Sequence, residues 1–258
     1  MAKWTAFPHA DKAYVYTAAT LKKNWERLHR GDCEPFAKDA KAQEAWIAYH
    51  AGEFEKAAEL GLKAGTAGYN AANKAICIYA NYLEKSEARK LKLYEEAAAR
   101  CEELQNKEPK NVNAWYLHAY ALGRYSQGIS VVKALSQGLG GKIKASLEQA
   151  LKLEPKHADA HIALGTYHAE IIDKVGSLIG GMTYGAKKET GMAHFDKALK
   201  LNPDSAIARI EYANGMIMLL GSAKMKDAEK LYQEAAKCKP ADAMERLDVE
   251  LAKSELED

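Results

Sequence analysis

Three histidines near the middle of the chain have a spacing that could hold a metal ion. His157 and His161 are four residues apart, so a helix would present both imidazoles on one face, and His168 follows two turns later. Imidazoles at this spacing can bind zinc, but the zinc-protease pattern also requires a glutamate directly after the first histidine, and Ala158 occupies that position. We therefore favour packing roles for these histidines, and we predict no metal site and no cofactor.

A second group of residues has the chemistry of molecular recognition. Tyr116, Tyr120 and Arg124 follow one another at steps of four, so one helical face would carry two aromatic rings and a guanidinium. These residue types often anchor protein interfaces. The alternative is that the tyrosines are buried against a neighbouring helix while Arg124 extends to solvent. Because the chain lacks a Gly-x-Ser-x-Gly motif and a cysteine beside a histidine, we predict that it is not an enzyme.

Composition excludes some partners. The 258 residues include 37 basic and 35 acidic side chains, mixed along the chain, and the net charge is +2. A nucleic-acid-binding protein is expected to carry a basic stripe, and none is present. Neither an export signal nor a stretch of membrane-spanning length is found, and the four cysteines are far apart. We therefore expect no nucleic acid, no membrane span and a cytoplasmic location.

A short phrase occurs twice and indicates the fold. Residues 150–155 read Ala-Leu-Lys-Leu-Glu-Pro, and residues 198–203 read Ala-Leu-Lys-Leu-Asn-Pro. Each copy is typical of the last turns of a helix that proline ends, and Pro109 and Pro240 divide the chain in the same manner. Self-similarity on this scale is the signature of a solenoid of stacked helix pairs.

The predicted architecture is an all-α, right-handed solenoid of about five helix pairs, forming a single elongated domain over residues 1–258. Asp11 is expected to cap an N-terminal helix at 11–29, repeats are expected over 36–240, and a capping helix over 241–257 places Met244, Leu247 and Leu251 on one face. The expected helices of the repeats are 36–50 and the one that follows it, 72–83 with 88–104, 111–125 with 142–153, 156–173 with 188–201, and 205–220 with 226–238.

The sequence resembles the tetratricopeptide repeat (TPR) family. Residues 46–58, Trp-Ile-Ala-Tyr-His-Ala-Gly-Glu-Phe-Glu-Lys-Ala-Ala, carry the tyrosine, turn glycine, aromatic residue and small alanine of that family in order. Further matches are Trp115, Leu164-Gly165, Phe195 with Ala198 and Pro203, and Ala228 with Ala235 and Pro240. A standard repeat has about 34 residues, whereas the units ending at Pro155 and Pro203 have 46 and 48.

The additional residues form two similar inserts, near 127–142 and 174–187. Their apolar residues align at an offset of 43 positions: Val132, Leu135 and Leu139 in the first, and Val175, Leu178 and Met182 in the second. One interpretation is that the inserts lengthen their helices and pack on each other. The other is an exposed apolar lip that contacts a ligand, a partner or, in a homodimer, a second copy of the chain. In either case we predict that both segments are structured together rather than flexible linkers.

A second resemblance concerns the sequence Leu139-Gly140-Gly141-Lys142 before an alanine-rich helix. It is similar to the repeat subunits associated with tripartite periplasmic carboxylate transporters, which are thought to bind small organic ligands or the transporter's binding protein. This resemblance implies an alternative function, that of a small-ligand-binding accessory protein of a transport system.

The TPR resemblance implies a concave groove lined by the first helix of each unit. Our leading hypothesis is a non-enzymatic scaffold that binds a peptide or protein partner in this groove. The candidate binding residues are Asn113, Tyr116, Tyr120, Arg124, Asp159, Ile162, Thr166 and Asn214.

Overall fold

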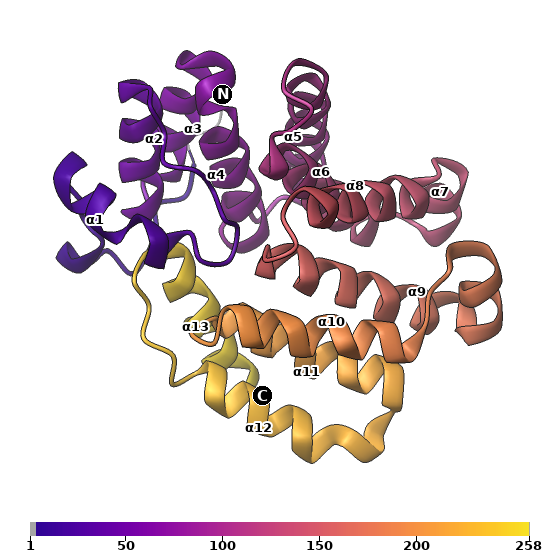
Figure 1. Cartoon of the computed structure of the whole chain (residues 1–258). Coiled ribbons are helices and arrows are strands. Elements are labelled where there is room, and N and C mark those ends of the chain that lie inside the picture. Colours follow the sequence, from indigo (N-terminus) through magenta and orange to yellow (C-terminus); the bar gives the residue numbers. More distant parts are fainter. Residues whose placement is uncertain (1–3, 258) are drawn as a thin grey trace. The chain divides into compact units, whose positions relative to one another are not determined.

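The computed structural model describes residues 4–257, and its regular elements are helices (Figure 1). The all-α helical-repeat fold predicted from the sequence is confirmed. The chain divides into two compact units. Unit 1 comprises residues 1–29, 33–139 and 241–244, and unit 2 comprises residues 30–32, 140–240 and 245–258. The expectation of a single elongated, right-handed domain stays a prediction.

Unit 1 is built from helices that pack on their neighbours in sequence. Helix α2 packs on α3, α3 on α4, α4 on α5, and α5 on α6. The largest side chains at its centre include Trp46, Tyr49, Tyr79 and Leu104, each at most 1% exposed. Its elements are η1 (Lys12–Tyr14), α1 (Ala18–Leu28), α2 (Ala40–His50), α3 (Phe54–Lys63), η2 (Gly65–Gly68), α4 (Tyr69–Tyr82), α5 (Glu87–Lys107), α6 (Val112–Gln127) and α7 (Val131–Ser136).

The first helix differs from the one expected at 11–29. Asp11 caps only the short η1, and Val15 then adopts an extended conformation. The reason is a stronger start signal downstream, because Thr17 and Thr20 form a reciprocal capping box that begins α1 at Ala18. A similar correction applies to the helix expected from residue 36. It begins at Ala40, since the Asp39 carboxylate accepts a hydrogen bond from the backbone of the first turn.

Unit 2 contains the remaining repeats. Helix α9 packs on α10 and α11, and α11 packs on α12. Phe195 and Leu219 are the largest side chains at its centre, at 0% and 1% exposed. The elements are α8 (Leu139–Leu153), α9 (Ala158–Tyr184), α10 (Lys188–Leu201), α11 (Ala206–Leu220), η3 (Ser222–Lys224), α12 (Met225–Ala235) and α13 (Ala243–Glu255). The first residue of α8 and the first two of α13 belong to unit 1.

Both inserts are helical. The first contains α7, and α8 then begins at Leu139, three residues before the expected start at 142. The second insert continues α9, which bends at Gly176, where φ is +80°. Only glycine adopts this conformation without strain. Packing of the two inserts on each other stays a prediction.

The closing helix α13 lies where a capping helix was expected. Val249 and Ala252 pack with Ala206, Ile210 and Ala235 of α11 and α12. None of the helices within 4–257 is both long and apolar enough to cross a membrane.

Candidate partner-binding site

The predicted recognition group on α6 is divided between core and surface. The Tyr116 ring packs edge-on against the Tyr120 ring, with centroids 6.3 Å apart, and Tyr116 is only 7% exposed. Tyr120 and Arg124 are half-buried, and the Arg124 guanidinium lies over the Tyr120 ring, 5.5 Å from its centroid. Tyr116 therefore supports the fold, while Tyr120 and Arg124 are partly exposed.

A second arginine, on α5, approaches the same region. Arg100 Nε donates a hydrogen bond of 2.8 Å to the Asn73 side-chain oxygen on α4, and Asn73 in turn donates to Cys101 Sγ. The neighbour of Arg100 is thus a neutral amide, and its Nη2 atom is buried and has no hydrogen-bond partner among the described residues. Sequence reasoning missed Arg100 because it considered the first helix of each unit, and α5 is a second helix.

The buried Cys77 thiol lies within the electrostatic influence of both arginines. Burial raises its pKa to about 12, and the positive charges of Arg100 and Arg124 oppose this increase. Burial also raises the pKa of Tyr94; Arg124 opposes this increase, whereas the Glu87 carboxylate adds to it. We call Arg100, Tyr120 and Arg124 the arginine site.

Asn113, another predicted binding residue, holds a segment of the chain itself. Its side-chain amide donates a hydrogen bond of 2.6 Å to Glu34 Oε2. The Asn70 amide donates to both oxygens of the same carboxylate at 3.1 and 3.0 Å, and also to Asn111 Oδ1. The segment after α1 is thereby fixed to α4 and α6.

The candidates in unit 2 also have partners within the fold. The Asp159 backbone N–H donates to Gly31 O at 3.0 Å, and the Asp159 side chain packs closely on Gly31. Thr166 donates a hydrogen bond to Glu211, and Asn214 accepts one from Tyr232. Ile162 is 6% exposed and belongs to an apolar cluster with Ala198 and Ala208. A partner-binding role for Asp159, Ile162, Thr166 and Asn214 stays a prediction.

The histidines have hydrogen bonds that determine their tautomers. The His157 side chain accepts a hydrogen bond from the Ala160 backbone and caps α9. His161 Nε2 lies 3.1 Å from the Pro155 carbonyl oxygen, which can only accept, so this nitrogen carries the proton. His161 Nδ1 then accepts from His194 Nδ1–H at 2.8 Å. His194 escaped the sequence analysis because it lies 33 residues along the chain.

His168 completes this group. Its Nδ1 accepts a hydrogen bond of 3.2 Å from the Lys187 backbone, and its ring stacks on that of His194. Burial lowers the pKa of both His168 and His194 to about 4, so both are neutral at physiological pH. No three potential ligands within 4–257 are arranged to hold a metal ion. The packing roles predicted for His161 and His168 agree with these contacts.

Comparison with solved structures identifies the class of fold. The structure is similar to the crystal structure of TTC0263, a thermophilic TPR protein from Thermus thermophilus, with a TM-score of 0.58 and 17% sequence identity. The alignment covers 83% of this chain and 97% of that one. The fold is thus the TPR-like helical repeat that the sequence resembled.

A comparison with models of protein families gives a more specific identification than the fold. The profile of the RMD1-3 family, described as regulator of microtubule dynamics protein 1-3, matches residues 69–257. The chain belongs to this family. No individually curated protein matches the sequence.

Proposed function

We propose that this protein is a non-enzymatic scaffold that binds an acidic segment of a protein partner at the arginine site of unit 1. The observation that carries this proposal is the Arg124 guanidinium held over the Tyr120 ring, with both side chains partly exposed. Arginine and tyrosine are among the residue types most enriched at the hot spots of protein interfaces. The TPR-like fold agrees with a role in protein interaction.

The preference for an acidic segment follows from charge. From Pro109 to Leu147 the chain contains no aspartate or glutamate, so the charge that helix α6 contributes through Arg124 is positive. Guanidinium groups bind carboxylates through charge-assisted hydrogen bonds, which are about twice as strong as neutral ones. An aspartate or glutamate side chain of the partner, next to an apolar group on the Tyr120 ring, fits this site.

The family description supplies one candidate. It names regulators of microtubule dynamics, so tubulin is the first protein to be tested as the partner. None of the observations favours the alternative function, the small-ligand-binding accessory of a transport system.

The test measures binding of the full chain to tubulin and to fluorescent polyglutamate and polylysine peptides. We expect binding to tubulin and polyglutamate but not to polylysine. Arg124→Ala should weaken binding by about tenfold or more while stability changes little. Arg124→Lys should recover only part of the loss, because an ammonium cannot form the bidentate contact.

The matched control is Lys110→Ala, which removes an exposed cation from the same acid-free stretch but outside the arginine site. It should bind normally. If neither tubulin nor polyglutamate binds, or if Arg124→Ala loses stability with unchanged binding, the arginine site is structural and the proposal is wrong.

A further inference from the structure

A short segment from late in the chain belongs to unit 1. The residues of unit 1 come from the first 139 positions, except for the segment 241–244, which reads Ala-Asp-Ala-Met. The residues on either side of this segment, 140–240 and 245–258, belong to unit 2. Residues 239–242 lie outside the helices, and α13 begins at Ala243. The contacts of this segment therefore define which chemical groups unit 1 can hold.

Asp242 places a carboxylate at the centre of unit 1. Its Oδ2 atom lies 2.7 Å from His50 Nδ1, and both side chains are at most 2% exposed. An ionised carboxylate can only accept, so His50 Nδ1 carries the proton and donates. The other ring nitrogen, Nε2, has no hydrogen-bond partner within residues 4–257. Asp242 thus provides the hydrogen bond of this buried imidazole.

Aromatic side chains fix the orientation of the His50 ring. The Trp46 ring is stacked on it with an interplanar angle of 24°, and the Trp25 and Tyr49 rings meet it edge-on. Trp46 and Tyr49 are at most 1% exposed. Packing therefore determines where the Nδ1–H group points. A donor that is held in place loses little freedom on binding, which favours recognition of a carboxylate at this position.

The residues beside Asp242 have their own partners in unit 1. The Tyr16 hydroxyl donates a hydrogen bond of 2.8 Å to the Ala241 carbonyl, and the Tyr49 hydroxyl donates one of 2.9 Å to Met244 Sδ. Peptides are commonly recognised by this combination of main-chain hydrogen bonds and side-chain contacts at fixed offsets. We call Tyr16, Tyr49 and His50 the α2 site.

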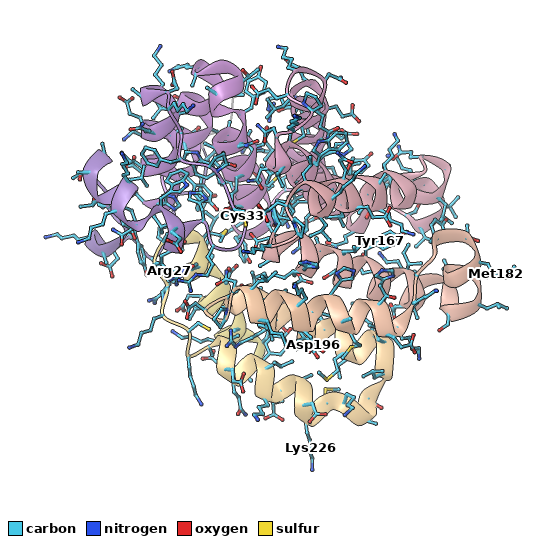
Figure 2. The ribbon with its side chains drawn as sticks, in the orientation of Figure 1. Arg27, Cys33, Tyr167, Met182, Asp196 and Lys226 are labelled. Atoms are coloured by element: carbon cyan, nitrogen blue, oxygen red, sulfur yellow. The ribbon has the colours of Figure 1, made fainter. Side chains whose placement is uncertain are left out.

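A second carboxylate of the chain is held in a similar manner. Unit 1 resumes at Cys33, which is labelled in Figure 2, and the next residue is Glu34. The Glu34 carboxylate accepts hydrogen bonds from Asn70 on α4 and Asn113 on α6. Polar side chains of α2, α4 and α6 thus hold carboxylates from segments outside the helices. This independent example supports the interpretation that these helices recognise acidic segments.

We propose that the α2 site recognises an aspartate that is followed two residues later by a methionine, and that the segment 241–244 occupies the site as an intramolecular ligand. A protein partner with the same pattern binds α2 only where it displaces this segment. The segment therefore regulates access to the α2 site. This proposal concerns α2 and does not depend on the arginine site.

A segment of the same chain has an advantage over a free ligand. A tethered ligand can reach an effective concentration of about 1 mM, so a free peptide at a much lower concentration competes poorly with it. Weakening the tethered segment, while the α2 site itself is unchanged, should allow the free peptide to bind. The experiment uses this difference.

The experiment measures binding of a fluorescent peptide of residues 239–247, Lys-Pro-Ala-Asp-Ala-Met-Glu-Arg-Leu, to the full chain. The variant Asp242→Asn keeps the shape of the tethered segment but removes its charge, and charge-assisted hydrogen bonds are about twice as strong as neutral ones. We expect this variant to bind the peptide about tenfold or more tightly than the unaltered protein does. The same substitution in the peptide should weaken its binding to the variant by about tenfold.

A second variant, Met244→Ala, removes the sulfur that Tyr49 contacts in the tethered segment. It should also increase peptide binding. Thermal unfolding shows which variants are folded, and Met244→Ala decides the test if Asp242→Asn is not. The control is Asp227→Asn, which changes an exposed aspartate of α12 that pairs with Lys224 outside the α2 site. It should bind the peptide as weakly as the unaltered protein.

Three results would overturn the proposal. The first is that the folded variants bind the peptide no better than the unaltered protein, which would make the contact of Asp242 purely structural. The second is equal binding of the peptide with asparagine, which would show that the carboxylate is not recognised. The third is tight binding of the peptide to the unaltered protein, which would show that the segment 241–244 does not occupy the α2 site.

Discussion

The Glu34 carboxylate lies 2.6 Å from the side-chain amide of Asn113, a residue predicted to bind a partner. With the two hydrogen bonds from Asn70, this carboxylate occupies the amide groups of two successive first helices, α4 and α6. Asn70 is 6% exposed and Asn113 is 2% exposed, so both amides meet Glu34 in a region shielded from water. The contact is therefore part of the stability of unit 1.

Replacing Glu34 with alanine should destabilise the protein by about 1–3 kcal/mol, because it removes the carboxylate that accepts hydrogen bonds from two buried amides. Urea unfolding measures this loss directly. Glu44→Ala removes an exposed carboxylate of α2 and should change the unfolding free energy by less than about 0.5 kcal/mol. Equal stabilities of the two variants would show that the Glu34 contact contributes nothing.

Two glycines of unit 2 make room for Phe195. A methyl group at Gly165 would lie 2.8 Å from the Phe195 ring, and one at Gly215 would overlap the ring from another side. We expect Gly215→Ala to reduce the unfolding free energy by about 1–3 kcal/mol, as overpacking of a core does. Thermal or urea unfolding is the measurement.

Gly123 on α6 provides the opposite case. A methyl group there meets no atom within 4 Å. Gly123→Ala should therefore stabilise the protein by about 0.5–1 kcal/mol, because alanine favours a helix over glycine. A stabilising Gly215→Ala would disprove the close packing of Phe195.

Stability should fall in mild acid because of the histidine group. Burial holds the pKa of His168 and His194 at about 4, below the ordinary value of 6.5. As the pH falls, a histidine whose pKa is lowered by folding is protonated in the unfolded chain at a higher pH than in the folded protein. Its stabilising contribution is thus complete above pH 6.5 and decreases as the pH falls toward 4, with about two protons taken up on unfolding.

The variant His168→Asn with His194→Asn separates this group from the other titrating residues. Asparagine offers an acceptor for the Lys187 backbone and a donor for His161 but does not titrate between pH 4 and 7. The melting temperature of the variant should depend less on pH in this range. An unchanged slope in the double variant would contradict the assignment.

The sequence predicted the elements whose signals are local. Helices α5, α8 and α10 each end two residues before a proline, at Lys107, Leu153 and Leu201, because proline restricts the residue that precedes it and cannot continue the helix. The TPR resemblance at Leu164-Gly165 and Phe195 also has a physical basis, since that glycine accommodates that ring. The fold class could therefore be predicted from the prolines that end helices and from the small residues at packing positions.

The candidate site was harder to predict because its contacts join distant residues. Helical periodicity placed Tyr120 and Arg124 on one face, but it gave no signal that Glu34, 79 residues earlier in the chain, binds Asn113. The role of Arg100 could not be predicted for the same reason, since α5 comes to lie beside Asn73 of α4 only in the folded protein. Periodicity specifies the face of a helix, and tertiary packing decides which groups already have a partner.

The contact between His50 and Asp242 has a consequence for folding of the chain during translation. His50 Nδ1 and Asp242 Oδ2 lie 2.7 Å apart at the centre of unit 1, and Tyr16 and Tyr49 also bond to the segment 241–244. Asp242 is translated 192 residues after His50. The repeat that contains His50 therefore completes this buried contact only after the segment 241–244 has left the ribosome, and a chain terminated before that segment lacks the carboxylate that His50 contacts in the folded protein.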